Sequence, residues 1–229
     1  MDCEERTRLL ICYGNEELLQ MADKIKGKSA FLGERIKDAR ACTDAGTLLG
    51  IEGEAASVYF SAFDDLILQQ KDCFFFRGRN RRPPLDNVNA MLSFAYSLLA
   101  GMCASALEAV GLDPYVGFFH TDRPGRASLA LDMMEELRGI MADRFVLTLI
   151  NKRIVDDGAF LKKESGAVVM DDDTRKLFLA QWQNKKKGSI THPFLGEKIE
   201  WGIVPHAQAM LLARYIRGDL DEYPPFLWK

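Results

Sequence analysis

The chain of 229 residues contains few prolines, eight in all, and few clusters of turn-forming residues. This scarcity argues against a sandwich or barrel of many short strands, because such folds need frequent turns. The five cysteines are odd in number, widely scattered and without a CxxC pair, which argues against a disulfide framework or a zinc cage. We therefore expect reduced thiols in a cytoplasmic protein.

A large excess of one charge is also missing. The sequence has 30 Lys and Arg against 33 Asp and Glu, a net charge of −3, which excludes a uniformly basic nucleic-acid wrapper but not a local basic patch. Charged residues are absent altogether from 87–107, a stretch long enough to cross a bilayer. Its many Ala, Gly, Asn and Ser residues favour the buried central helix of a bundle instead, so we expect no membrane partner.

Helical signals dominate the remaining sequence, and the predicted class is all-α and bundle-like. Residues 1–45 are expected to form two amphipathic lead-in helices, followed by a helical catalytic domain over 46–229. Within that domain, start and stop signals predict helices over about 43–70, 87–107, 128–144, 174–187 and 204–217. One small β-hairpin is expected at about 159–170, where apolar residues alternate around Ser165-Gly166.

Glu52 stands in the middle of an apolar stripe when residues 47–68 are placed on a helix. Glu54 points the opposite way and is expected to face solvent. We therefore expect Glu52 to be buried, and a buried carboxylate must be paired or bound to a metal. A buried salt bridge to an arginine is the alternative. The apolar side consists of Leu48, Leu49, Ala55, Ala56, Tyr59, Phe63, Leu66 and Ile67.

His120 lies on an irregular segment just before a helix that carries Asp132, Glu135 and Glu136. A histidine beside two or three carboxylates forms a mixed nitrogen and oxygen donor set, which favours Mg²⁺ or Mn²⁺ over zinc. The alternative is ordinary: a structural histidine, and carboxylates on the wet face of a helix. Spacing alone does not choose between Glu135 and Glu136.

A run of positive charge interleaved with phenylalanines occupies residues 71–82, and two more arginines follow close to His120. Such a concentrated strip suits a phosphate backbone, whereas a solvated loop is the alternative. The arginines concerned are Arg77, Arg79, Arg81, Arg82, Arg123 and Arg126. His192 and His206 have no carboxylates patterned around them, and we expect both to be structural.

Three sequence blocks in this order resemble the CRISPR-associated endonuclease family that acts as the spacer integrase, the first-numbered Cas proteins (Cas-one). They are LLGIEGEAASVYF, DNVNAMLSFAYSLLAGMCASALEAVGLDPYVGFFH and HTDRPGRASLALDMMEELR. The ending GDLDEYPPFLWK and the loop RGRNRRPP are similar to the I-C subtype. The resemblance covers the chain beyond about residue 45.

The resemblance implies a catalytic metal site for Mg²⁺ or Mn²⁺. Carried over residue by residue, its ligands fall on Glu52, His120 and Glu135, with Asp132 as an assisting carboxylate. Tyr96 matches a family tyrosine near the site, and Asn89 lies two turns before it. Both join the arginines as expected DNA-binding residues.

The implied function is metal-dependent phosphoryl transfer on double-stranded or branched DNA, in which a captured 3′-hydroxyl is joined to the repeat. Members of this family also carry an N-terminal β domain that forms the homodimer and contacts a small ferredoxin-like partner, Cas-two. We expect that domain to be absent from this chain, which begins in predicted helices. Two alternatives are an inactive DNA-binding fragment and an unrelated metal-dependent phosphoesterase.

Overall fold

The structure is a computed structural model, and it describes residues 16–121 and 123–227. The chain divides into two compact units. The first contains residues up to 71 together with 75–79, and the second contains 72–74 together with residues from 80 onward. The predicted division after residue 45 falls inside the first unit.

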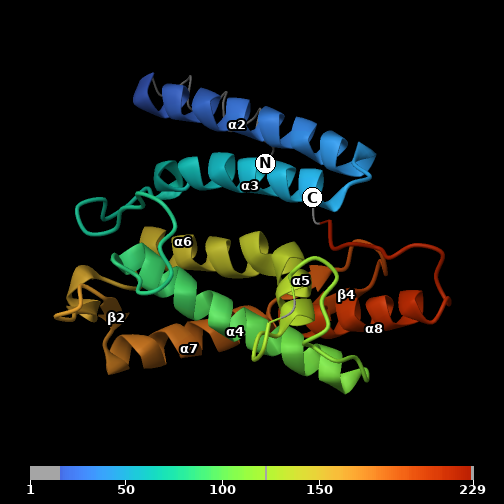
Figure 1. Cartoon of the computed structure of the whole chain (residues 1–229). Helices are drawn as coiled ribbons and strands as arrows, with labels where there is room; N and C mark the ends of the chain where they lie inside the picture. The colour runs from blue at the N-terminus through green and yellow to red at the C-terminus, as the bar shows by residue number, and fades with distance from the viewer. Residues whose placement is uncertain (1–15, 122, 228–229) are drawn as a thin grey trace. The chain divides into compact units, whose positions relative to one another are not determined.

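The first unit consists of two antiparallel helices, α2 (Glu16–Ala41) and α3 (Ala45–Ser61), followed by a short 3-10 turn, η1 (Asp64–Leu66) (Figure 1). Asp44 caps α3 by accepting a hydrogen bond from the backbone N–H of Thr47 at 2.7 Å. An ion pair joins the helices, with 2.9 Å between Arg35 Nη1 and Glu54 Oε2. Of the two helices predicted over 1–45, the described part contains the single helix α2, and residues 1–15 lie outside the described part.

Two predictions for this unit are wrong. The helix expected to reach residue 70 ends at Ser61, because the rings of Phe60, Phe63 and Phe76 cluster there and redirect the chain. Glu52, expected to be buried, is exposed. No described side chain of α3 is buried. The apolar residues around Glu52 on this helix are therefore not covered, although their composition predicted a buried face.

The second unit is built on the apolar helix α4 (Asn87–Ala109), which Asp86 caps by accepting a hydrogen bond from the N–H of Asn89. α4 packs against α5 (Ser128–Leu137), α6 (Arg144–Asn151) and α8 (Val204–Ile216) (Figure 1). α7 (Asp172–Lys187) packs against the 3-10 turn η4 (Trp201–Ile203) that leads into α8. Ten residues of α4 are buried. Although α4 passes a length and composition test for a membrane span, its burial is that of a core helix.

Two small antiparallel hairpins complete the second unit. The predicted one is present, with β1 (Phe160–Lys162) paired to β2 (Val168–Met170). A second hairpin, β3 (Ser189–Thr191) with β4 (Lys198–Glu200), was not predicted. Its strands are three residues long and only partly buried, so they leave almost no alternation in the sequence. The all-α class is confirmed.

The helix predicted over 128–144 extends further and changes character on the way. α5 ends at Leu137, a π-helical segment η2 spans Arg138–Asp143, and α6 continues to Asn151. The predicted C-terminal end at residue 144 was wrong because Phe145, Val146, Leu149 and Ile150 continue the buried face.

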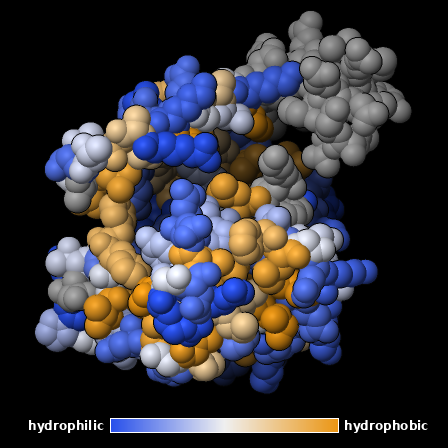
Figure 2. All heavy atoms as spheres, turned by 90° about the vertical axis from the view of Figure 1, so that its right-hand side faces the viewer, coloured by the Kyte–Doolittle hydropathy of each residue, from blue (hydrophilic) through white to orange (hydrophobic). Residues whose placement is uncertain are grey.

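Figure 2 shows one face of the molecule, on which apolar and hydrophilic residues are intermixed, as on an ordinary globular surface.

Candidate active site

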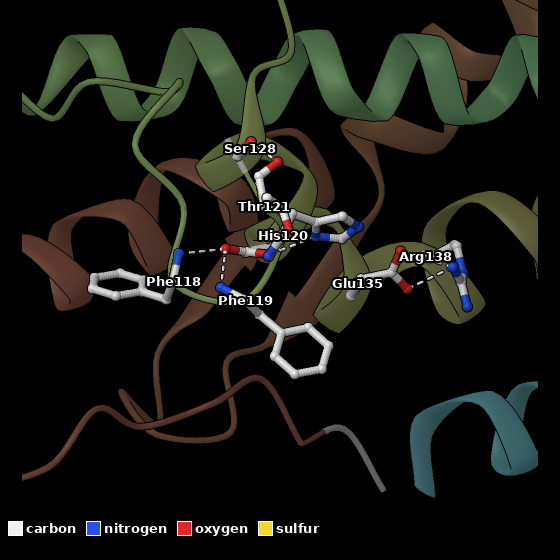
Figure 3. A network of polar contacts seen from close by, with 8 residues as sticks. Phe118, Phe119, His120, Thr121, Ser128, Glu135 and Arg138 are labelled. Carbon is white, nitrogen blue, oxygen red and sulfur yellow. Dashed lines mark hydrogen bonds and ion pairs between the residues drawn. The ribbon is translucent and has the colours of Figure 1, made fainter. Parts of the chain in front are cut away.

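His120 and Asp132 form the most tightly connected polar contact of the second unit. The distance between His120 Nδ1 and Asp132 Oδ1 is 2.5 Å. Asp132 also accepts hydrogen bonds from the backbone N–H groups of Phe118, Phe119 and His120, at 2.7, 3.0 and 2.9 Å (Figure 3). One carboxylate on α5 therefore holds both the loop and its imidazole.

The charge of Asp132 is favoured by these donors. Burial on its own raises the pKa of this carboxyl, but the hydrogen bonds from Phe119, His120 and Phe118 outweigh burial, and the net pKa lies below its ordinary value. An ionised Asp132 can only accept, so Nδ1 of a neutral His120 must carry the proton. Nε2 then keeps its lone pair, which is the state in which an imidazole binds a metal.

Gly117 allows the loop to approach α5 this closely. A Cβ atom at this position would lie 2.7 Å from the Ser128 Cβ, 2.9 Å from the His120 carbonyl oxygen and 3.0 Å from Asp132 Oδ2. Two of these neighbours are backbone or a short side chain and cannot move away easily. A glycine is therefore required beside the histidine.

Glu135 lies on the same helix as Asp132, and Figure 3 shows the outer edge of the His120 ring turned toward the side on which Glu135 lies. Glu135 forms an i,i+3 ion pair with Arg138, 2.6 Å between Oε2 and Nη1. Arg138 also lies over the Tyr96 ring, 5.8 Å from its centroid. Tyr96 in turn donates a hydrogen bond of 2.5 Å to Asp143 Oδ1.

Glu136 has different hydrogen-bond partners from Glu135. Its two oxygens accept from the Gln208 amide, the Tyr223 hydroxyl and the backbone N–H of Phe226. The Glu136 carboxylate is therefore fully engaged in holding α5 to other parts of the fold. The choice of Glu135 over Glu136 as a ligand stays a prediction from the family resemblance.

The predicted DNA-binding residues are placed in different surroundings. Arg77, in the first unit, is exposed and lies over the Phe75 ring, and Arg79 of that unit is half-buried. In the second unit Arg81, Arg82 and Arg123 are exposed and Arg126 is half-buried.

Asn89, which we predicted to contact DNA, is completely buried. Its side chain accepts from the N–H of Asn80 and donates to Asp86, so it holds the loop that displays the arginines. Its burial argues against a direct contact with DNA. Tyr96 is half-buried, and its hydroxyl group is used by Asp143.

His120 and Glu135 are donor types that suit a divalent ion, but they do not form a complete site on their own. An imidazole whose Nδ1 is held by a carboxylate is the usual arrangement of a metal-binding histidine, and Glu135 adds an oxygen donor of the kind that Mg²⁺ and Mn²⁺ prefer. Within residues 16–121 and 123–227, no three His, Cys, Asp or Glu side chains are grouped closely enough to hold a metal. Glu52 belongs to the first unit.

Comparison with known proteins identifies the family. The family described as CRISPR associated protein Cas1 matches residues 5–184, further toward the N-terminus than the resemblance noted beyond about residue 45. A CRISPR-associated endonuclease Cas1 from Chlorobaculum tepidum is 52% identical over 207 residues, 90% of this chain and 60% of the relative. Another, from Rhodospirillum rubrum, is 54% identical over 193 residues, 84% and 56%. The chain belongs to the Cas1 family.

The fold is shared with solved members of this group. A casposase bound to its integration product superposes with a TM-score of 0.75 and 26% identity, covering 90% of this chain and 61% of that one. The chain spans about three fifths of the length of the curated relatives it matches. Family membership leaves no basis for the alternative of an unrelated phosphoesterase.

Sequence reasoning missed the roles of two residues. The contacts by which Asp132 orients His120 and the loop were not predicted, and its assistance at a metal stays a prediction. Arg138 was not singled out, although the spacing of Glu135 and Arg138 at i,i+3 is an available signal.

Proposed function

We propose that this chain carries the catalytic site of a metal-dependent DNA endonuclease and integrase of CRISPR adaptation. The reaction is phosphoryl transfer, in which the 3′-hydroxyl of a captured DNA is joined to the repeat. Water in place of the hydroxyl gives strand cleavage. Support comes from the family of endonucleases to which the chain belongs and from a relative of the fold that is described as bound to an integration product.

The single observation that carries the proposal is the fixed state of His120. Asp132 accepts the hydrogen bond from Nδ1–H and anchors three successive backbone N–H groups of the same loop. Such an arrangement orients the imidazole and excludes the wrong tautomer. Within residues 16–121 and 123–227, no hydrogen-bond partner contacts Nε2, which leaves this nitrogen available to a ligand.

We propose that Glu52, His120 and Glu135 hold the ion, Mg²⁺ or Mn²⁺. When bound, such an ion neutralises the charge that develops on the phosphate oxygens. Arg138 forms an ion pair with Glu135, so a metal ion bound by Glu135 would replace the Arg138 guanidinium as its partner. Only 17% of the Arg138 side chain and 30% of the Glu135 side chain are exposed, so a bound ion must offset the loss of this pairing.

DNA is positioned through its backbone by the six arginines, since phosphate contacts carry no base information. Exposed Arg81, Arg82 and Arg123 are best placed for this in the second unit. A homodimer and the Cas-two partner belong to the proposal for the complete family protein.

The deciding experiment measures cleavage and strand joining on a branched DNA with Mn²⁺, for the wild-type chain and for His120→Ala. We expect metal-dependent activity that the variant lacks. His206→Ala is the matched control because His206 lies on α8, outside this site, and it should remain active.

Activity that survives in His120→Ala contradicts the site. Inactivity of the wild-type chain, together with retained DNA binding, supports the alternative of a DNA-binding fragment instead.

A further inference from the structure

A polar cluster in the interior of the second unit is not used by the proposed chemistry. We call it the Glu136 cluster; it consists of Glu136, His192, Gln208 and Tyr223 with the backbone of Phe226. Gln208 and His192 are almost fully buried, at 0% and 1% exposure. These residues come from α5, the end of β3, α8 and the C-terminal segment, so they join four parts of the chain that are distant in sequence.

Hydrogen bonds of the cluster link His192 to Glu136 through Gln208. His192 Nδ1 accepts from the backbone N–H groups of Phe194 and Leu195, so its Nε2 carries the proton and donates to Gln208 Oε1 at 3.0 Å. The Gln208 amide then donates to Glu136 Oε2 at 2.9 Å. The same amide lies 2.8 Å from the Tyr223 hydroxyl and 3.3 Å from the Pro224 carbonyl oxygen, so Gln208 contacts both Glu136 and the C-terminal segment.

The last residues of the chain bind the same carboxylate. The Tyr223 hydroxyl donates to Glu136 Oε1 at 2.8 Å, and the backbone N–H of Phe226 donates to Oε2 at 2.9 Å. The Phe226 ring is buried and packs edge-on against His192 and Trp201, with ring centroids 5.4 and 6.1 Å apart. We call residues 223–227 the C-terminal strap.

This arrangement does more than cover the core. Apolar contacts resist separation of a helix from its neighbours but tolerate small rotations, whereas three directional hydrogen bonds to one carboxylate fix the rotation of α5 about its axis. Glu135 is the residue before Glu136, about 100° around the helix, and Asp132 lies about one turn before Glu136. The rotation that the strap fixes is therefore the rotation that sets where Glu135 and Asp132 point.

We propose that the C-terminal strap is a positioning element for the metal site, and that Glu136 and Tyr223 are positioning residues that act through the orientation of α5. The proposal rests on the proposed function, because it takes Glu135 and His120 as metal ligands. Loss of the strap contacts weakens metal binding although none of these residues touches the ion.

The test compares Tyr223→Phe and Glu136→Gln with two control variants of the full chain. Tyr223→Phe removes one donor and keeps the ring; Glu136→Gln keeps the shape but turns an amide donor toward other donors. Tyr215→Phe on α8 and Leu227→Ala in the strap alter exposed side chains and are the controls. For each protein, the Mn²⁺ dissociation constant is measured by electron paramagnetic resonance and unfolding by differential scanning calorimetry.

We expect the Mn²⁺ dissociation constant to rise roughly tenfold in Tyr223→Phe and Glu136→Gln, the lower end of the effects of outer-shell partners. It should stay unchanged in both controls. A lower melting temperature with unchanged Mn²⁺ affinity overturns the proposal, because it shows a structural role only.

Hydrogen–deuterium exchange of residues 128–138 without metal separates this proposal from the proposed function. If the wild-type chain binds no Mn²⁺, the proposed metal site is wrong. Hydrogen–deuterium exchange then tests only whether the strap fixes the orientation of α5. Faster exchange confined to α5 in Tyr223→Phe supports the positioning role of the strap, and unchanged exchange overturns it.

Discussion

Glu135 and Glu136 are neighbours in the chain, yet their side chains have different surroundings. Glu135 is paired with Arg138 on the outside of α5, whereas Glu136 receives donors from α8 and the C-terminal strap. Nothing local in the sequence separates them, because the partners of Glu136 lie 72 to 90 residues away. At the residue scale, the roles of these carboxylates are set by long-range contacts.

Asp132→Asn should damage the site and the fold together. The amide has one acceptor oxygen in place of two and would turn its NH₂ group toward protein donors. We expect a loss of about 1–3 kcal/mol in the free energy of unfolding, and roughly 10- to 100-fold in activity. Nitrogen NMR of His120 checks the mechanism, since the Nε2-protonated tautomer should appear only in the variant. An unchanged tautomer would contradict it.

Glu52→Gln should abolish metal-dependent activity if Glu52 is a ligand, as the family resemblance implies. Glu54→Gln is the matched control, because Glu54 is also exposed and forms an ion pair with Arg35 that contributes about 0–1 kcal/mol. Cleavage assays on branched DNA measure both. Equal losses would remove Glu52 from the proposed site.

The stability of the protein should depend on the protonation of His192. Burial lowers the pKa of this imidazole, and the hydrogen bond with Gln208 only partly offsets the effect. The unfolded chain therefore binds the proton more readily, and the free energy of unfolding should fall as the pH drops through about 6.5. Urea denaturation at pH 7.5 and 5.5 measures this loss.

His192→Gln should remove most of that pH dependence, whereas His206→Gln, on α8, should keep it. The lowered pKa of Asp132 acts in the same direction but at more acid pH, below the ordinary value of 3.8. It does not disturb the chosen interval. A dependence that persists in His192→Gln would assign it to another group.

At the scale of elements, the loop 117–120 depends on the closeness of its approach to α5. Gly117→Ala places a methyl group within 3.0 Å of three atoms, so we expect a loss of about 1–3 kcal/mol in stability. Activity should fall as well, because His120 would be displaced. Thermal unfolding and the branched-DNA assay report the two effects.

Gly101→Ala is the control for this substitution. Gly101 is exposed on α4, and no atom lies within 4 Å of the position that an alanine methyl group would take, so alanine should stabilise the helix by up to about 1 kcal/mol. If Gly117→Ala behaved like Gly101→Ala, the close approach of the loop would be unimportant.

Elements with complete local signals could be predicted. Asp86 before a long apolar run located the start of α4, Ser165-Gly166 located the first hairpin, and Gly218, with φ of +79°, marks the end of α8. The second hairpin has no such signal. The continuation from α5 into α6 depends on the π-helical η2, a departure from the period of 3.6 that helix prediction assumes.

The site could be predicted in part. The proximity of His120 to the carboxylates of the next helix follows from the chain path, and the choice of Glu135 came from family resemblance. The burial of Glu52 was wrong because a stripe of apolar residues predicts burial only where another layer covers it, and α3 has no buried side chain in its described part. Asn89 was misassigned because its partners Asn80 and Asp86 lie in the preceding loop.

At the scale of the whole molecule, a net charge of −3 means that DNA affinity must come from local arginines. Affinity for duplex DNA should therefore fall steeply with salt. Replacing exposed Arg81 and Arg82 with alanine should reduce the slope of log K against log salt by about two. The control replaces Lys162 and Lys163, exposed residues in and beside β1, and should leave the slope unchanged. Equal slopes for both double variants would contradict a backbone contact at the arginines.

The four hydrogen bonds gathered by Asp132 also bear on how the protein is made. During synthesis the loop with His120 leaves the ribosome before Asp132 does, so the imidazole has no fixed tautomer until α5 has formed and closed on it. A nascent or partly denatured chain then holds a histidine but not an oriented one. Under the proposed function, correct folding becomes a condition for cutting DNA, and the cell is protected from a nuclease that is active while still incompletely folded.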